Sequence, residues 1–308
     1  MSNRIIKLFA LCFICFILFI GCKSKPYDMV SPTTGKIKIA VDENLKDIVD
    51  QEKQIFESIY KYAQIELQIV PEHTLINTLY SDSVRTAFLT RSLSQEEMLF
   101  FKQRNIYPRL IQFATGALAF IVSNQSPDTA YTYESFLSLL SNPAKGKHFI
   151  IENNKSGIAS QLLQVIGKDT LPGNFYAKQN KNEIYQYIQL DHDAIGIIDY
   201  SDISDSDLSS NKQLFQTTNL LAITRPKDSV QHGYLRPYQY NLQDRLYPFT
   251  RDLYFVSTSG LNDVGMGFIA FVAGEIGQKI VLKSGLLPKY QSERWIELKS
   301  GAKPMIVK

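Results

Sequence analysis

Apolar side chains recur along this chain with two different periods, that of a strand and that of a helix. Residues 37–41 and 65–70 alternate with the period that is typical of half-buried strands. Between them, residues 45–62 repeat apolar side chains at helical spacing. Further strands are predicted at 86–89, 148–151, 194–200 and 220–223, and further helices at 72–80, 94–103, 132–140, 160–167, 182–190, 265–273 and 275–284. This succession predicts an α/β fold with a parallel sheet and helices on both of its faces.

Two long extended segments interrupt the succession. Residues 109–123 and 247–257 are longer than the other predicted strands and are interpreted as connections between two units. We therefore predict a discontinuous lobe 1, residues 36–115 and 248–308, and a lobe 2, residues 116–247. Loops that follow the strands of both lobes would line the cleft between them, which is where open α/β sheets bind ligands.

The N-terminus carries a targeting segment. Residues 8–20 are all apolar and follow the basic Arg4 and Lys7. This run is shorter than the roughly 20 residues of a membrane span, and it suits the apolar region of a signal peptide. We predict a signal peptide over residues 1–21, with an uncleaved N-terminal anchor as the alternative. Either arrangement places the folded part outside the cytoplasm.

The end of the apolar run indicates lipidation. Gly21-Cys22 follows the run and resembles a bacterial lipobox, although Phe19 stands where that pattern usually has leucine. We expect Cys22 to be lipidated, with chains such as palmitate, and residues 22–35 to form a polar tether. The protein would then be anchored to a membrane of the cell envelope, with its folded part periplasmic or on the cell surface.

The charge, cysteine content and motifs of the chain argue against several functional classes. The formal net charge of +3 and the dispersed basic residues give no support for binding to nucleic acid. The three cysteines are Cys12, Cys15 and Cys22, so the lipidated mature chain keeps no thiol for a disulfide, a metal site or a nucleophile. The chain also lacks a Gly-x-Ser-x-Gly elbow. We predict no enzyme, no catalytic residue and no cofactor.

The histidines give no indication of a metal centre. They are His73, His148, His192 and His232. Their spacing is not that of metal ligands, and residues 191–193 (Asp-His-Asp) are interpreted as a solvated turn. The Ser- and Asp-rich residues 201–210 are interpreted as a surface loop, with a calcium site as the alternative. We predict no bound metal.

One loop has the features of an anion site. Residues 152–160 follow a buried strand and contain Ser156-Gly157 just before a predicted helix. The first N–H groups of a helix are free and favour negative charge, and glycine lets the backbone approach a ligand. The alternative for this pair is a helix N-cap with a tight turn.

Several segments together resemble a known family. They are residues 268–271, 274–281 and 285–288, the extended segments 247–254 and 114–119, residues 194–200, and Thr90-Arg91-Ser92-Leu93. In their order along the chain they resemble the phosphate-binding proteins of bacterial ABC transporters, the PstS-like branch of type II periplasmic binding proteins. The resemblance covers almost the whole mature chain. It implies a two-lobed fold, each lobe being a mixed, mainly parallel sheet flanked by helices.

The resemblance also implies a ligand site. Its residues would be Asp42, Glu43, Asn44, Thr90, Arg91, Glu152, Lys155, Ser156, Gly157 and Ile158. The loops depart from the family pattern, because Val41-Asp42 replaces Gly-Ser, Asn44 and Ile158 replace threonines, and Glu152 replaces an arginine. A phosphate dianion beside two carboxylates would be repelled by several kcal/mol at an effective dielectric constant of about 20. We expect Lys155 and Arg91 to supply compensating charge.

Two of these residues have structural alternatives. Asp42 also suits a helix N-cap, and Arg91 also suits a structural ion pair. With these alternatives open, the sequence predicts a monomeric, lipid-anchored solute-binding protein. It would capture phosphate or a related small ligand for an ABC-type importer, with the importer's permease as partner. The alternative function is an envelope sensor or interaction lipoprotein of the same fold that has lost phosphate binding.

Overall fold

The structure, a computed structural model, describes residues 30–205, 207–227, 232–290, 294–296 and 305–307. The predicted signal peptide, Cys22 and most of the predicted tether lie outside these residues. The first strand begins at Thr34, within the range predicted as tether.

The elements follow one another in the alternating order that the sequence predicts. They are β1 Thr34–Asp42, η1 Glu43–Leu45, α2 Lys46–Ile59, β2 Tyr62–Val70, α3 Glu72–Tyr80, β3 Thr86–Leu89, α4 Gln95–Gln103, β4 Arg109–Ser123, β5 Ala130–Tyr131, α5 Tyr133–Ser141, η2 Pro143–Lys145, β6 His148–Ile151, α6 Gly157–Ile166, β7 Phe175–Ala177, α7 Lys181–Leu190, β8 Ala194–Asp199, η3 Tyr200–Asp202, α8 Ser209–Thr217, β9 Thr218–Leu220, β10 Ala222–Ile223, α9 Gln239–Gln243, β11 Thr250–Ser257, α10 Val264–Val272, α11 Glu275–Lys283, β12 Leu287–Pro288, β13 Arg294–Ile296 and β14 Met305–Val307.

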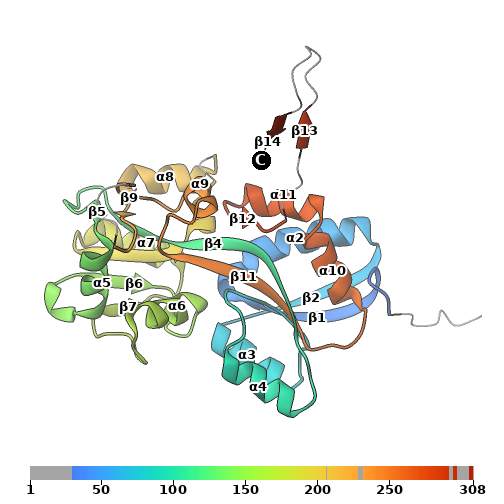
Figure 1. The fold of residues 1–308 in the computed structure, drawn as a ribbon. Helices are drawn as coiled ribbons and strands as arrows, with labels where there is room; N and C mark the ends of the chain where they lie inside the picture. Colours follow the sequence, from blue (N-terminus) through green and yellow to red (C-terminus); the bar gives the residue numbers. More distant parts are fainter. Residues whose placement is uncertain (1–29, 206, 228–231, 291–293, 297–304, 308) are drawn as a thin grey trace, which may run out of the picture.

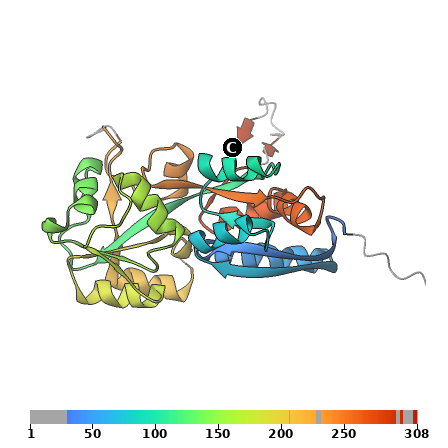
Figure 2. The same cartoon turned by 90° about the horizontal axis from the view of Figure 1, so that it is seen from below.

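One mixed sheet runs through the molecule in the order β2-β1-β3-β11-β4-β8-β6-β7. The strands β2, β1 and β3 are mutually parallel, and β11 is antiparallel to both β3 and β4. Further along the sheet, β8 is antiparallel to β4, whereas β6 and β7 are parallel to β8. The long strands β4 and β11 therefore join two lobes, and helices flank the sheet in each (Figures 1 and 2). This arrangement confirms the predicted fold class.

Alternation along β1 sets the two faces of lobe 1. Ile39 and Val41 belong to a core cluster with Phe56 of α2, which α10 and α11 complete. Ala40 points to the opposite face and joins a second cluster with Leu75 of α3. Helices α3 and α4 lie on that second face (Figure 1). Because the strand alternates in this way, both faces of the lobe 1 sheet are covered and its loops project from its ends.

Lobe 2 has its own core, formed by buried residues from Ala117 to Phe249. Its strand β8 is fully buried, as the sequence predicts for residues 194–200. Gly196 in this strand allows close packing, since an added Cβ would overlap the side chain of Ile188 in α7. The strand and its helix are thus held at a short separation, which fixes the position of Asp199 at the end of β8.

Some local predictions are correct and others are wrong. Helix α4 begins where the sequence predicts a helix, with a capping box in which Ser94 Oγ accepts from Glu97 N and the Glu97 side chain accepts from Ser94 N. The predicted strand 220–223 is instead divided between β9 and β10, which pair with different strands. The predicted helix from 160 begins earlier, at Gly157. The predicted surface loop 201–210 contains η3 and the start of α8.

Two further features concern the described residues as a whole. No single helix among them is long and apolar enough to cross a membrane, although α10 and α11, bent by 62° relative to each other, meet that criterion as a pair by length and composition. No group of three or more His, Cys, Asp or Glu side chains in the described ranges could hold a metal ion.

Candidate functional site

The carboxyl ends of strands from both lobes meet between the lobes. Asp42 is the last residue of β1, and Thr90 follows β3. From lobe 2, Asp199 ends β8, and the loop after β6 leads into α6 at Gly157. Because β1 and β3 are parallel, as are β6 and β8, these positions share the edge at which such sheets bind ligands.

Gly157 brings the two lobes into direct contact. A Cβ added to this residue would overlap the hydroxyl of Thr90 and would lie 3.1 Å from Asp42 Oδ2. The preceding Ser156 is the N-cap of α6, since its Oγ accepts from Ala159 N at 3.3 Å. Ser156 is therefore a helix N-cap, and anion binding by Ser156-Gly157 stays a prediction. The N-terminus of α6 faces lobe 1 directly.

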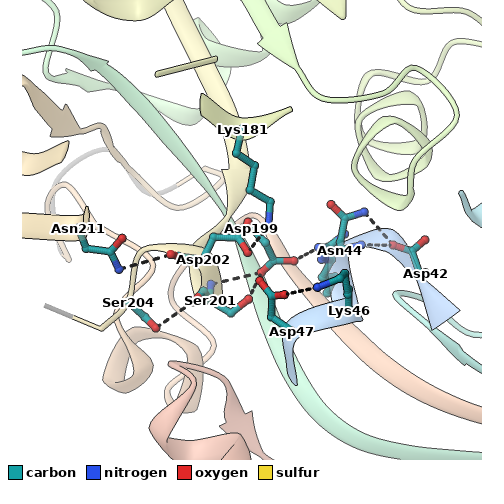
Figure 3. A network of polar contacts seen from close by, with 11 residues as sticks. Asp42, Asn44, Lys46, Asp47, Lys181, Asp199, Ser201, Asp202, Ser204 and Asn211 are labelled. Carbon is teal, nitrogen blue, oxygen red and sulfur yellow. Dashed lines mark hydrogen bonds and ion pairs between the residues drawn. The ribbon is translucent and has the colours of Figure 1, made fainter. Parts of the chain in front are cut away.

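Asp42 is completely buried at this contact. Its Oδ1 accepts hydrogen bonds from the backbone N and from Nδ2 of Asn44, at 2.9 and 2.8 Å (Figure 3). This geometry confirms the helix N-cap alternative for Asp42, with η1 as the capped helix. The other oxygen, Oδ2, has no hydrogen-bond partner among the described residues. Burial raises the pKa of Asp42, and the nearby Arg251 opposes this shift.

Arg251 supplies the positive charge beside Asp42. It lies at the start of β11, is only 6% exposed, and donates from Nη2 to Asp199 Oδ2. Its Nε and Nη1 have no partner within the described part of the chain. Burial lowers the pKa of Arg251 to about 10, although Asp42 and Glu72 favour its charged form. Sequence reasoning missed Arg251; an arginine inside an otherwise largely apolar extended segment was the available signal.

Arg91 is held by carboxylates of its own lobe. Its Nε donates to Glu72 Oε1 at 2.9 Å, and its Nη1 and Nη2 donate to the two oxygens of Glu97 at 2.8 Å each. These contacts confirm the ion-pair alternative for Arg91. They raise its pKa despite burial, so it stays charged, but much of that charge is already matched.

The structure separates three other predicted residues from this contact. Ile158 packs into the core of lobe 2, so only its backbone remains near the start of α6. Lys155 is exposed, and the charge that acts on Asp42 comes from Arg251 instead. Glu152 is half-buried and interacts electrostatically with Glu43 and Lys181.

Glu43 of lobe 1 and Glu152 of lobe 2 belong to a second charged cluster, which also spans the two lobes. Asn153 of lobe 2 donates to Glu43 Oε2 of lobe 1 at 3.4 Å. Lys181 is paired with Asp202 at 2.6 Å, and Asp47 lies in the same network (Figure 3). Burial and the charge of Asp42 raise the pKa of Glu43 to about 7. Glu43 is therefore the predicted site residue whose charge changes near neutral pH.

A groove of about 1020 Å³ opens beside the Gly157 contact. It is lined by Glu72, Thr90, Arg91, Ser92, Leu93, Ser94, Gly157, Ser160, Gln161, Leu163, Gln164, Val165, Lys168, Asp169, Pro248, Thr250, Arg251, Asp252 and Tyr254. These residues come from both lobes and from β11, and they include arginine, hydroxyl and carboxylate groups. The groove is a polar path from solvent to Thr90, Gly157 and Arg251.

Comparison with known proteins identifies the family to which this two-lobed fold belongs. Residues 29–275 match the family model of the PBP superfamily domain, and the chain belongs to that family. No curated protein matches the chain.

Solved structures with the same fold include phosphate-binding proteins. The structure is similar to a putative phosphate ABC transporter substrate-binding protein with bound phosphate from Clostridium perfringens (18% identity, TM-score 0.65, 82% of this chain and 99% of that one). It is also similar to an ABC-type phosphate transport receptor from Vibrio cholerae (15%, 0.64, 82% and 100%) and to PstS from Borrelia burgdorferi (20%, 0.53, 82% and 98%). These neighbours confirm the PstS-like, type II periplasmic-binding-protein fold.

Adding one methyl group at Gly157 tests the contact between the lobes. We expect Gly157→Ala to separate the lobes and to destabilise the protein by about 1–3 kcal/mol, because the new Cβ overlaps the Thr90 hydroxyl. Small-angle scattering should show a larger radius of gyration, and urea unfolding should show the loss of stability.

A second substitution provides the rescue. Thr90→Ala in the Gly157→Ala background removes the overlapping hydroxyl and should restore both the radius of gyration and much of the stability. Gly173→Ala is the control, since an added Cβ there meets nothing within 4 Å. An unchanged radius for Gly157→Ala would show that the two lobes do not depend on this contact.

Proposed function

We propose that the protein is a lipid-anchored, extracytoplasmic solute-binding protein that captures phosphate or a related small ligand for an ABC-type importer. The observation that carries this proposal is the meeting of the α6 N-terminus with Thr90 and Asp42 at facing strand ends. Free helix N–H groups, a hydroxyl and a buried guanidinium are groups that bind oxyanions. The fold shared with phosphate-binding proteins supports the same ligand class.

Capture requires the lobes to move apart, because Thr90 and Gly157 are in contact. The two connections β4 and β11 join the lobes, and residues 114–117 and 246–251 are where we place the hinge. A ligand would enter through the polar groove and be enclosed as the lobes return. The domain boundaries at 115/116 and 247/248 remain a prediction that agrees with this motion.

The anchor and the partners belong to the same proposal. The apolar residues 8–20 followed by Cys22 support lipidation at the start of the mature chain. A monomer tethered in this way would remain near the membrane and deliver its ligand to an ABC permease. Binding and release, without chemical change of the ligand, would be its whole activity.

Titration calorimetry of the purified protein with phosphate tests the proposal. We expect binding to be tighter at pH 6 than at pH 8 by at least about tenfold, since a proton shared between ligand and Asp42 reduces their repulsion. Burial raises the pKa of the Asp42 carboxyl, so proton uptake there becomes easier as the pH falls. Sulfate, which carries no proton at either pH, is the control and should bind much more weakly.

A specific observation favours a second candidate. Asp42 and Glu72 are both buried beside Arg251, and Thr90 already touches Gly157. An envelope sensor or interaction lipoprotein that has lost phosphate binding would have such a contact without needing a ligand. Absence of heat at millimolar phosphate at both pH values would exclude phosphate capture and leave this candidate.

A further inference from the structure

Three groups that attract anions converge where the lobes meet. Gly157 is the first residue of α6, so its N–H belongs to the unpaired first turn and to the positive end of the helix dipole. Arg251 is buried nearby with Nε and Nη1 unpartnered among the described residues. Thr90 adds a hydroxyl in direct contact with Gly157, which here donates to Glu72 Oε2 at 3.4 Å. Such a convergence stabilises a negative charge placed within it.

A carboxylate of the chain itself lies beside these groups. Asp42 Oδ1 is occupied by both hydrogen bonds from Asn44, whereas Oδ2 is free of partners within the described chain. Oδ2 lies 3.1 Å from the point where a Cβ of Gly157 would be, so it faces the start of α6 across the lobe boundary. The Asp42 side chain is fully buried, so bulk water cannot solvate its charge.

We propose that Asp42 is a built-in anionic ligand, which occupies the anion subsite at the α6 N-terminus and must be displaced before a soluble anion can bind there. This inference rests on the proposed function, because it assigns the ligand subsite to the lobe contact. It makes Asp42 the specificity-determining residue of that site. A soluble anion must therefore compete with the Asp42 carboxylate for the subsite, and a fully ionised dianion is repelled most by any Asp42 charge that stays nearby.

The surrounding charges support the same conclusion. Four carboxylates, Asp42, Glu72, Glu97 and Asp199, surround only two guanidinium groups, Arg91 and Arg251. Arg91 is engaged by Glu72 and Glu97, and Arg251 is shared between Asp199 and Asp42. A dianion added to this cluster would meet excess negative charge, and loss of the Asp42 charge would reduce that excess and leave more of the Arg251 charge for the ligand.

Replacing Asp42 by serine provides the decisive test. Serine at this position can still cap Asn44 N, as N-cap serines do, but it removes the charge and leaves room for a ligand. Calorimetry at pH 8 should show phosphate binding to Asp42→Ser at least about tenfold tighter than to wild type, together with new sulfate binding. Asp42→Asn keeps the size and the Oδ1 contacts, so it should show the same direction of change if the serine variant folds poorly.

The control and the outcomes separate this inference from the proposed function. Asp50→Asn removes one negative charge from the outer part of α2 and should leave both affinities unchanged. If wild type binds phosphate but folded Asp42→Ser and Asp42→Asn bind no tighter, the inference is overturned and phosphate capture stands. If wild type does not respond and the variants bind, the inference is supported and phosphate capture is refuted. If no protein binds either anion, both are overturned.

Discussion

Replacing Arg251 by methionine is expected to destabilise the protein by about 3–5 kcal/mol, as found when one partner of a buried ion pair is removed. Arg251 is only 6% exposed and pairs with Asp199, which is 1% exposed. Without the guanidinium, Asp199 and Asp42 would be buried without an opposite charge between them. Urea unfolding at neutral pH, followed by far-UV circular dichroism, measures the loss.

A double variant distinguishes the ion pair from simple packing. Arg251→Met combined with Asp199→Asn removes both charges and should recover part of the stability, because the cost arises from the unpaired carboxylate. Arg109→Met is the matched control, since Arg109 is partly exposed and its Nη2 donates to two backbone carbonyls. Equal losses for Arg251→Met and Arg109→Met would contradict a structural role for the buried pair.

The fold was predictable where local pattern and tertiary packing agree. Residues 37–41 were predicted as a strand, and the consecutive apolar residues Ile39, Ala40 and Val41 are buried on both of its faces. Ser94 and Glu97 form their capping box within a single turn, so the start of α4 depends on neighbouring residues alone. The long segments that became β4 and β11 were recognisable by length.

Local pattern failed where distant contacts decide the structure. Helix α8 begins with polar residues that have no helical periodicity, and Asn211 secures it by donating to the carbonyls of Asp202 and Asp205. The region predicted as the strand 220–223 divides because β9 pairs with β4 whereas β10 pairs with β5. Neither partner can be inferred from the segment itself.

In the candidate site, too, features set by neighbouring residues were predictable and features set by distant contacts were not. Loops that follow strands were recognisable, and Asp42, Thr90, Ser156 and Gly157 do lie near one another. Side-chain direction was not recognisable, so Ile158 was included although it packs into the core of lobe 2. Arg251 was missed because its partner Asp199 lies 52 residues away, across the join between the lobes. The residue type in an otherwise largely apolar extended segment was a local signal, but it did not reveal the partner.

Glu52 is a buried carboxyl group in helix α2 of lobe 1. It lies on the core-facing side of α2 with Ile48, Val49 and Phe56, and it is 1% exposed. Neither carboxylate oxygen has a hydrogen-bond partner among the described residues. Burial alone raises the pKa of Glu52 to about 9. The folded protein therefore keeps this side chain protonated at neutral pH, whereas the unfolded chain ionises it.

The sign of the resulting pH dependence follows from proton binding. Between the ordinary value of 4.5 and about 9, the folded state holds a proton at Glu52 that the unfolded state has released, so stability falls as the pH rises. Glu52→Gln removes this linkage. We expect the variant to match wild type near pH 4.5 and to be more stable by about 2–4 kcal/mol at pH 8, as measured by urea unfolding across that range.

Glu66→Gln is the control for Glu52, because the Glu66 side chain is 72% exposed and forms a surface pair with Lys38. Its effect on stability should stay within about 0.5 kcal/mol at each pH. The difference between the two variants isolates the buried carboxyl from the other groups whose pKa values are raised, such as Glu43. If Glu52→Gln changed stability equally at low and high pH, packing of the amide rather than the proton on Glu52 would determine the result.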